Sequence, residues 1–297
     1  MRPTPLCVAG LAALALAACQ PVRPDAPPAV ATHPAAPATV PADDNLNAVL
    51  WVQRSAEYRA LAEQTYRAAA DHLDAALKQA DWDALVAEER GSAGTGLKPA
   101  VVLDIDETVL DNSPYQARLV RDGGEYSDPA WDAWVEERKA TAIPGVVAFA
   151  RAASARGITL VYISNRAVHL KDATLDNLRA AGLPVADDSV FLGLGTVVPG
   201  CEQEGSEKDC RRRLAGQRYR VLMQFGDQLG DFVRIDANTP AGRQGLLEQY
   251  GDWFGRRWWI LPNPTYGSWE PALFDNDWRQ PRQARRAAKR AALEVAP

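Results

Sequence analysis

Four short, largely apolar segments, separated by helical segments, constrain the fold of this chain more than any other feature. They occupy residues 100–105, 159–164, 220–225 and 258–261. Apolar strands that alternate with helices are typical of βαβ units, in which helices cover both faces of a parallel sheet. The sequence therefore predicts an α/β fold with a mostly parallel sheet and helices on both faces.

The chain begins with the pattern of an export signal. Arg2 precedes an apolar run over residues 6–18, which is about half the length needed to cross a bilayer. The run ends in LAAC, which resembles the lipobox of bacterial lipoproteins. The alternative is an ordinary secretory signal with a chance cysteine. The resemblance implies removal of residues 1–18, acylation of Cys19 and, with Gln20 after it, an extracytoplasmic protein held to the bacterial outer membrane by lipid.

The segment after the signal, residues 19–42, is rich in Pro and Ala and almost without large apolar residues. It buries too little surface to fold, so we expect an extended tether followed by one folded domain over residues 43–297. The whole chain has 33 Lys and Arg against 38 Asp and Glu, a net charge of −5. This balance argues against a nucleic acid polymer as the main partner.

The folded domain should open with helices over residues 43–96. Apolar residues at helical spacing predict a helix from Asn45 to about Gln79, with Asp43 or Asp44 as its N-cap. A second, shorter helical run is expected over residues 82–90. Glycine and serine then mark a break before the first strand.

Polar side chains follow each of the predicted strands. Ligands bind outside the carboxyl ends of the strands in Rossmann-like sheets, so these positions are candidates for a site. Asp104 and Asp106 stand two residues apart and point to the same side if the strand continues that far. One acidic residue here is as often a helix cap, but several polar groups at one edge rarely arise by chance. The candidates are Asp104, Asp106, Ser164, Asn165, Arg166, Asp227, Asp231, Asn263 and Tyr266.

Together with Lys208, these motifs resemble the phosphatase branch of the haloacid dehalogenase (HAD) superfamily. The segments IDETVLDNSPY, VYISNR, GDQLGDF and LPNPTYGSWE further resemble the class C acid phosphatases, which include outer-membrane lipoprotein 5′-nucleotidases. The similarity runs from about Leu50 to Trp278. It implies that Asp104 is a nucleophile forming an aspartyl phosphate and that Asp106 is the general acid and base.

The resemblance also implies a magnesium site and a phosphate site. Asp104, the main-chain carbonyl of Asp106 and Asp227 would offer hard oxygen ligands to Mg²⁺. Asp231 is a direct ligand, an outer-shell residue or a cap of the following segment. The implied phosphate ligands are Ser164, Asn165 and Lys208, although Lys208 also fits a solvated basic cluster in SEKDCRRR.

Substrate selection is assigned, again by resemblance, to aromatic rings. Trp131 and Tyr266 fall where the family places rings that sandwich a nucleobase, whereas Trp134 is expected to pack in the interior. The implied function is Mg²⁺-dependent hydrolysis of small-molecule phosphomonoesters, nucleoside 5′-monophosphates in particular. The alternatives are a broad acid phosphatase without nucleotide preference and a haem- or ligand-binding envelope lipoprotein. The only histidines for haem are His33, His72 and His169.

Three further features concern the surroundings of this site. The stretch between about residues 111 and 142 is expected to be a small helical insertion. Cys201 and Cys210 flank Lys208, and they form either a disulfide or two reduced thiols. Gln228 departs from the family pattern, in which many relatives have Asn.

Overall fold

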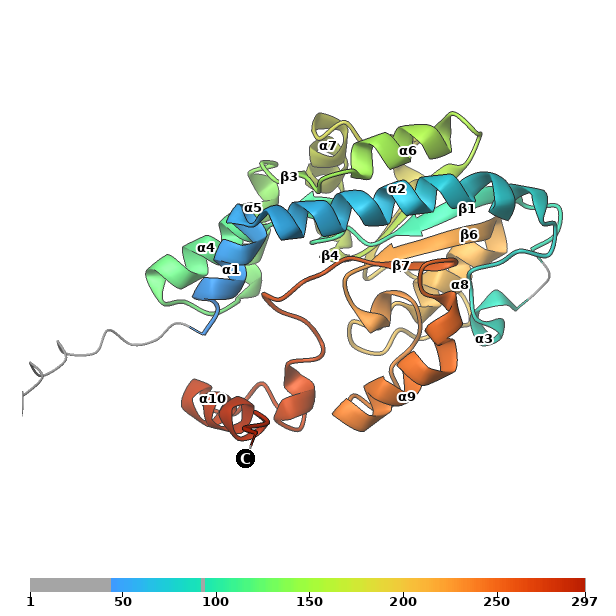
Figure 1. Ribbon diagram of the computed structural model, residues 1–297. Coiled ribbons are helices and arrows are strands. Elements are labelled where there is room, and N and C mark those ends of the chain that lie inside the picture. The colour runs from blue at the N-terminus through green and yellow to red at the C-terminus, as the bar shows by residue number, and fades with distance from the viewer. Residues whose placement is uncertain (1–43, 92–93, 297) are drawn as a thin grey trace, which may run out of the picture. The chain divides into compact units, whose positions relative to one another are not determined.

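A computed structural model describes residues 44–91 and 94–296 of the protein. The predicted signal segment and tether, with Cys19, lie outside these residues. In the described part, five parallel strands form a sheet in the order β5-β4-β1-β6-β7 (Figure 1). The strands are β1 (Lys98–Leu103), β4 (Thr159–Ala167), β5 (Phe191–Leu194), β6 (Tyr219–Gly226) and β7 (Trp258–Ile260). The predicted α/β fold with a parallel sheet is therefore confirmed.

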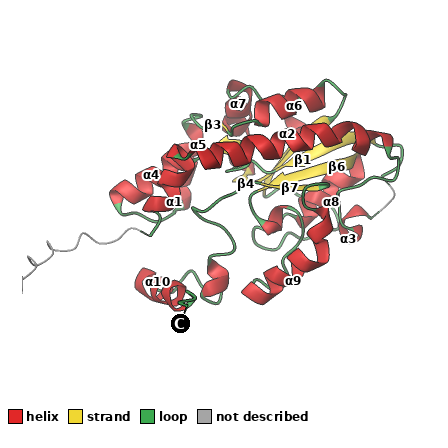
Figure 2. Cartoon of the chain, in the orientation of Figure 1, coloured by secondary structure: helices red, strands yellow, loops and turns green. Residues whose placement is uncertain are grey.

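Helices cover both faces of the sheet, as Figure 2 shows. Side chains of β1 alternate between two buried clusters, with Val101 and Leu103 on one face and Ala100 and Val102 on the other. The first face packs against α2 (Ala56–Lys78), α6 (Val146–Ser154) and α7 (Lys171–Ala180), and the second against α8 (Asp209–Arg218). Burial on both faces explains why the strands are apolar nearly throughout.

The fifth strand, β5, was not predicted from the sequence. It has four residues and contains Gly193, so neither its length nor its composition marks it as a strand. The glycine is required by close packing, because a Cβ atom there would lie 2.6 Å from the main-chain oxygen of Arg166 on the neighbouring β4. Only the folded sheet reveals this constraint.

The expected helix over residues 45–79 is in fact two helices, α1 (Leu46–Arg54) and α2. Ser55 breaks the helix by adopting an extended conformation, and its hydroxyl accepts a hydrogen bond of 3.1 Å from the main-chain nitrogen of Tyr58. It thus serves as the N-cap of α2. The N-cap position of α1 is Asn45, whereas Asp44 pairs with Arg286.

The expected helix over residues 82–90 is largely wrong. Only α3 (Ala87–Arg90) is helical, and residues 82–86 form an irregular, mostly buried segment beside β6. The main-chain nitrogen of Ala84 donates to the oxygen of Val221 over 2.8 Å, and the indole of Trp82 donates to the oxygen of Leu222 over 2.7 Å. Tertiary hydrogen bonds thus override the helical pattern of this segment.

Between β1 and α6 the chain forms two helices, α4 (Ser113–Asp122) and α5 (Asp128–Glu136). They stand between two short antiparallel strands, β2 (Leu110–Asp111) and β3 (Thr141–Ala142). The pairing brings the two ends of this segment together next to the carboxyl end of β1. It therefore places the side chains of α5, including Trp131, near the predicted site.

The remaining helices follow the sheet strands or end the chain. They are η1 (Val168–Leu170), η2 (Asp188–Val190), η3 (Leu229–Asp231), α9 (Pro240–Tyr250), η4 (Gly251–Trp253), η5 (Pro271–Leu273) and α10 (Arg282–Ala291). Basic residues of α10 form ion pairs with Asp44, Glu125 and Glu270. Within the described residues, no helix has both the length and the apolar character needed to span a bilayer.

Candidate active site

The carboxyl ends of β1 and β6 bring three carboxylates and one lysine together. Asp104 directly follows β1, and its main-chain nitrogen donates to the oxygen of Phe225 on β6 over 2.9 Å. Lys208, which precedes α8, donates to both Asp104 and Asp231, the latter over 2.6 Å. All three side chains are buried. The structure thus places Lys208 in the site and not in a solvated cluster.

Burial controls the charge state of this group. Loss of solvent raises the pKa of Asp104 to about 7, with the neighbouring carboxylates of Asp231 and Asp106 adding to the rise and Lys208 opposing it. Burial opposes the charge of Lys208, yet Asp104 and Asp231 hold the pKa of its ammonium above the ordinary value. The lysine therefore stays cationic beside the acids.

Asp227 completes a candidate cation site at the end of β6. One carboxylate oxygen each from Asp104, Asp227 and Asp231 lie within 4.8 Å of one another. Burial, followed by repulsion from Asp231 and Asp104, raises the pKa of Asp227 well above its usual range. Three acids against one lysine leave a deficit of positive charge, and their hard oxygens suit a divalent cation such as Mg²⁺.

The side chain of Asp231 is engaged through both oxygens. Oδ1 accepts from Lys208, and Oδ2 accepts from the main-chain nitrogens of Asp227 and Gln228 over 3.0 and 2.9 Å. The carboxylate also approaches the main chain closely, since a Cβ at Gly226 would lie 2.3 Å from it. This arrangement favours a role in capping the 227–231 turn and holding Lys208.

Asp106 is held by three donors that converge on one oxygen. Arg166 reaches Oδ1 with Nε over 2.9 Å and with its terminal nitrogen over 2.8 Å, and Asn112 donates to the same oxygen over 2.9 Å. The other oxygen, Oδ2, has Ser164 Oγ at 3.4 Å. Trp134, buried as expected, donates its indole N–H to Asn112 over 2.8 Å.

The predicted phosphate ligands lie at the end of β4. Ser164 is buried, and its hydroxyl accepts from the main-chain nitrogen of Arg166 over 3.0 Å. Asn165 is exposed, and its side-chain oxygen accepts from Arg211 over 2.7 Å. Arg211, on α8, also donates to the main-chain oxygen of Ser164. Burial, together with repulsion from Arg212, lowers the pKa of Arg211 to about 10.

The loop that carries Lys208 is closed by a disulfide between Cys201 and Cys210. The bond spans nine positions and encloses Lys208, which is the N-cap residue of α8. Since both sulfurs are bonded to each other, the cluster of Cys201, Asp209 and Cys210 offers no thiolate to a metal.

The two predicted stacking residues come from different segments, Trp131 from α5 of the insertion and Tyr266 from the segment after β7. Trp131 is half-buried on α5, where its ring meets the ring of Tyr115 edge-on at 5.2 Å, and the guanidinium of Arg166 lies 5.7 Å from its centre. Tyr266 is half-buried in the segment after β7, and its hydroxyl donates to buried Glu107. Glu107 itself adopts a left-handed conformation with φ of 58°.

Several residues of the site were not assigned a role from the sequence. Arg166 belongs to the VYISNR motif, and Glu107 belongs to DIDETV, three positions after Asp104. Neither motif by itself predicts what these two side chains contact. Arg211 stands three residues after Lys208 in a run of arginines. Their roles come from contacts between segments far apart in the chain, as with the 60 positions between Arg166 and Asp106.

Each of the two described histidines contacts an oxygen of another residue. His33 lies outside the described residues, His72 Nδ1 is 2.8 Å from the main-chain oxygen of Ala68, and His169 Nε2 is 2.8 Å from Asp132. Neither potential metal-binding group in the described part of the chain contains a histidine.

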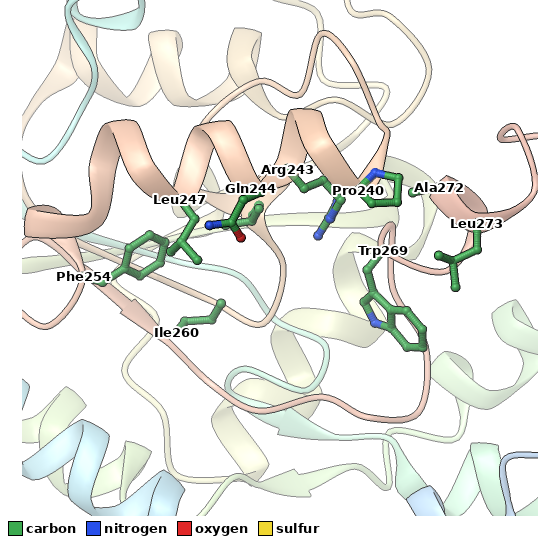
Figure 3. A pocket seen from close by; sticks show the side chains of 10 residues that line it. Pro240, Arg243, Gln244, Leu247, Phe254, Ile260, Trp269, Ala272 and Leu273 are labelled. Atoms are coloured by element: carbon green, nitrogen blue, oxygen red, sulfur yellow. The ribbon is translucent and has the colours of Figure 1, made fainter. Parts of the chain in front are cut away.

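An apolar hollow lies between α9 and the segment around η5 (Figure 3). It has a volume of about 590 Å³, and Leu247, Phe254, Ile260 and Trp269 are among its lining residues. Its one charged lining residue, Arg243, donates to Asn238 over 3.1 Å and to Ser268 over 3.0 Å. Asp104, Asp227 and Asp231 are not among the residues that line this hollow.

Comparisons with known proteins agree with this geometry. Residues 12–269 match the family described as HAD superfamily, subfamily IIIB (acid phosphatase). The class C acid phosphatase from Bacillus anthracis shares 35% sequence identity and a TM-score of 0.74, covering 85% of this chain and 98% of that one. The same values hold for that enzyme with tungstate bound.

Curated relatives are more distant. The stem 31 kDa glycoprotein of Glycine max is 26% identical over 56% of this chain and 58% of its own length. Acid phosphatase 1 of Solanum lycopersicum is 23% identical over 56% of this chain and 57% of its own. The chain thus spans a little over half the length of these relatives.

Proposed function

The chain belongs to subfamily IIIB of the HAD superfamily, the acid phosphatases, and we propose that it hydrolyses phosphomonoesters, preferably nucleoside 5′-monophosphates. The observation that carries the proposal is the cluster of buried Asp104, Lys208 and Asp231 with half-buried Asp227 at the carboxyl ends of β1 and β6. Tungstate, which the structurally similar enzyme binds, is an oxyanion like phosphate, and this also supports a phosphate site.

Asp104 is the proposed nucleophile. A carboxylate oxygen of Asp104 attacks phosphorus, the bond from phosphorus to the ester oxygen breaks, and an aspartyl phosphate forms. Lys208 and Thr108 hold the two oxygens of Asp104 in place, Thr108 donating over 3.1 Å. Lys208 also supplies positive charge next to the phosphoryl oxygens, with Ser164 and Asn165 as further donors.

Asp106 is the proposed acid and base. It gives its proton to the leaving alkoxide, then takes a proton from water, whose oxygen attacks phosphorus and releases phosphate and the free carboxylate of Asp104. Three donors on Oδ1 leave Oδ2 as the oxygen that carries the proton. Arg166 and Asn112 thus fix which side of Asp106 faces the substrate.

A divalent cation fits the cluster, and we propose Mg²⁺. Asp104, Asp227 and the main-chain carbonyl of Asp106 would hold it, while Asp231, engaged through both oxygens, acts through Lys208 and the 227–231 turn. When bound, the cation offsets repulsion between the carboxylate and the phosphate.

Asp106→Asn should harm esters with poor leaving groups most. The amide cannot donate a proton to an alkoxide, whereas an activated aryl phosphate leaves almost unaided. We expect kcat/KM for an alkyl phosphate to fall by about 100-fold or more and kcat/KM for the aryl ester to fall much less, because kcat/KM reports the step in which the leaving group departs. Equal losses of kcat/KM on the two esters would argue against the acid role, whereas kcat also includes hydrolysis of the aspartyl phosphate that both esters share.

Stacking on Trp131 and Tyr266 is proposed to give the nucleotide preference. Replacing either with Ala should lower kcat/KM for nucleoside monophosphates by about 5- to 150-fold, since stacking a base contributes about 1 to 3 kcal/mol. Glycerol phosphate, which has nothing to stack, should be nearly unaffected. Trp278→Ala, at a half-exposed ring of the C-terminal segment, is the matched control.

A panel of kcat/KM values on purified protein tests this assignment. It compares nucleoside monophosphates, sugar phosphates, glycerol phosphate and an aryl phosphate, for the wild type and the three Ala variants. A flat panel would replace the nucleotidase assignment with that of a broad acid phosphatase. No hydrolysis of any ester would refute phosphatase activity itself.

We also propose that the enzyme works outside the cytoplasm, held to the outer membrane through acylated Cys19. The disulfide between Cys201 and Cys210 supports an oxidising compartment, because glutathione and thioredoxin keep most cytoplasmic thiols reduced. The proposed partners are thus the small-molecule phosphomonoester and the outer membrane.

A further inference from the structure

The side chain of Gln228 bridges two loops of the site. Its amide nitrogen donates to Asp227 Oδ2 over 2.8 Å and to the main-chain oxygen of Tyr266 over 3.2 Å. Its amide oxygen accepts from the main-chain nitrogen of Ser268 over 3.0 Å. One side chain thus contacts a proposed metal ligand and the backbone on both sides of Gly267.

The side chain of Gln228 fills the space where a side chain at position 267 would begin. A Cβ atom at Gly267 would lie 2.3 Å from Oε1 and 2.5 Å from Nε2 of Gln228, closer than real Cβ atoms approach other groups. A methyl group at position 267 would therefore displace the amide of Gln228 from the position that it occupies here. A side chain shorter by one methylene would leave room for a methyl group there.

The segment around Gly267 also makes hydrogen bonds that do not involve Gln228. The hydroxyl of Tyr266 donates to Glu107, and Ser268 accepts from Arg243 of α9 over 3.0 Å. Asn263, at the start of the segment, also donates to Asp227 Oδ2, over 2.7 Å. If Gln228 is replaced by a shorter side chain, Asp227 therefore keeps the hydrogen bond from Asn263. The main-chain oxygen of Tyr266 loses its hydrogen bond to the loop that carries Asp227.

We propose that Gln228 is a positioning residue that sets the place of the Tyr266 ring relative to the catalytic cluster, and so determines selectivity for flat leaving groups. The inference rests on the proposed function, since it assumes that Tyr266 stacks on the leaving group. It assigns to Gln228 and Gly267 a joint role in binding and leaves the chemical step to Asp104 and Asp106.

The test uses three variants of the full protein: Gln228→Asn, Gly267→Ala and the double variant. Gln228→Asn should raise KM for a nucleoside monophosphate by about 3- to 10-fold, the effect of one or two lost hydrogen bonds, with kcat and the KM for glycerol phosphate changed less than about 2-fold. Gly267→Ala alone should raise the nucleotide KM by about 10-fold or more, because the methyl group displaces Gln228. Gln244→Asn, on the exposed surface of α9, is the matched control.

The double variant is the decisive measurement. If the close contact between Gln228 and Gly267 matters, the nucleotide KM of the double variant should be at least about 3-fold lower than that of Gly267→Ala. The rise in Tm on adding Mg²⁺ should match that of the wild type in Gln228→Asn, because Asn263 still orients Asp227.

Two outcomes would overturn the inference in distinguishable ways. If the Tyr266→Ala variant keeps the nucleotide preference of the wild type, the stacking assignment is refuted, and this inference with it. A preference that depends on Tyr266 but is unchanged in Gln228→Asn, or a double variant no better than Gly267→Ala, would refute the role of Gln228 alone.

Discussion

Asp104→Asn should leave a folded protein with less than about one hundredth of wild-type activity, because loss of a nucleophile removes several kcal/mol of transition-state stabilisation. The fold should survive because the substitution is nearly isosteric and Lys208 keeps Asp231 as an acidic partner at 2.6 Å. Steady-state kinetics on an aryl phosphate gives the loss, and circular dichroism with thermal melting checks the fold.

The matched control for this variant is Asp252→Asn, at an exposed position of η4. It should behave as the wild type in both measurements. Activity of Asp104→Asn above about one hundredth, with an unchanged melting curve, would refute the covalent mechanism. An unfolded Asp104→Asn protein would instead be replaced by Asp104→Glu, which keeps the charge but moves the carboxylate by one methylene.

Removal of divalent cations should stop turnover, and Mg²⁺ added back should restore it. The physical reason is that three carboxylates, two buried and one half-buried, lie close together while Lys208 pairs with only two of them, so a cation would reduce their mutual repulsion. Asp227→Ala should either abolish activity or raise the Mg²⁺ concentration for half-maximal activity by about 10-fold or more, as expected for a lost charged ligand. Activity against Mg²⁺ concentration, after dialysis with a chelator, measures both effects.

Asp252→Ala serves as the control in the metal titration, since it removes an acid far along the chain from the cluster. Full activity in excess chelator would contradict the metal requirement. An Asp227→Ala enzyme with a normal Mg²⁺ curve would place the cation elsewhere among the acids.

The sheet was predictable because its inner strands carry their own signal. β1, β4, β6 and β7 match the four apolar segments found in the sequence, since strands buried on both faces need apolar residues at nearly every position. The edge strand β5 has too few residues for such a signal. Residues 82–86 were assigned to a helix wrongly, because their hydrogen-bond partners lie on β6, about 140 positions away.

For the candidate site, the residues at the strand ends were predictable from the sequence, but the contacts that orient them were not. Residues at strand ends, such as Asp104 and Asp227, were selected because parallel strands deliver their carboxyl ends to one edge. The contacts that orient them were not predictable, because which donor reaches Asp106 depends on how β4 and α4 pack. Asn112 and Arg166 follow Asp106 by 6 and 60 positions, and neither spacing indicates that both side chains contact its Oδ1.

The disulfide around Lys208 makes assembly of the site depend on thiol chemistry as well as on packing. Cys210 is 1% exposed in the folded protein, where its sulfur is bonded to Cys201. Such a bond forms by thiol–disulfide exchange, which requires an oxidant that reaches both thiols. Under the localisation proposed above, export would therefore come before oxidation, and a chain retained in the cytoplasm would lack the covalent link that encloses Lys208.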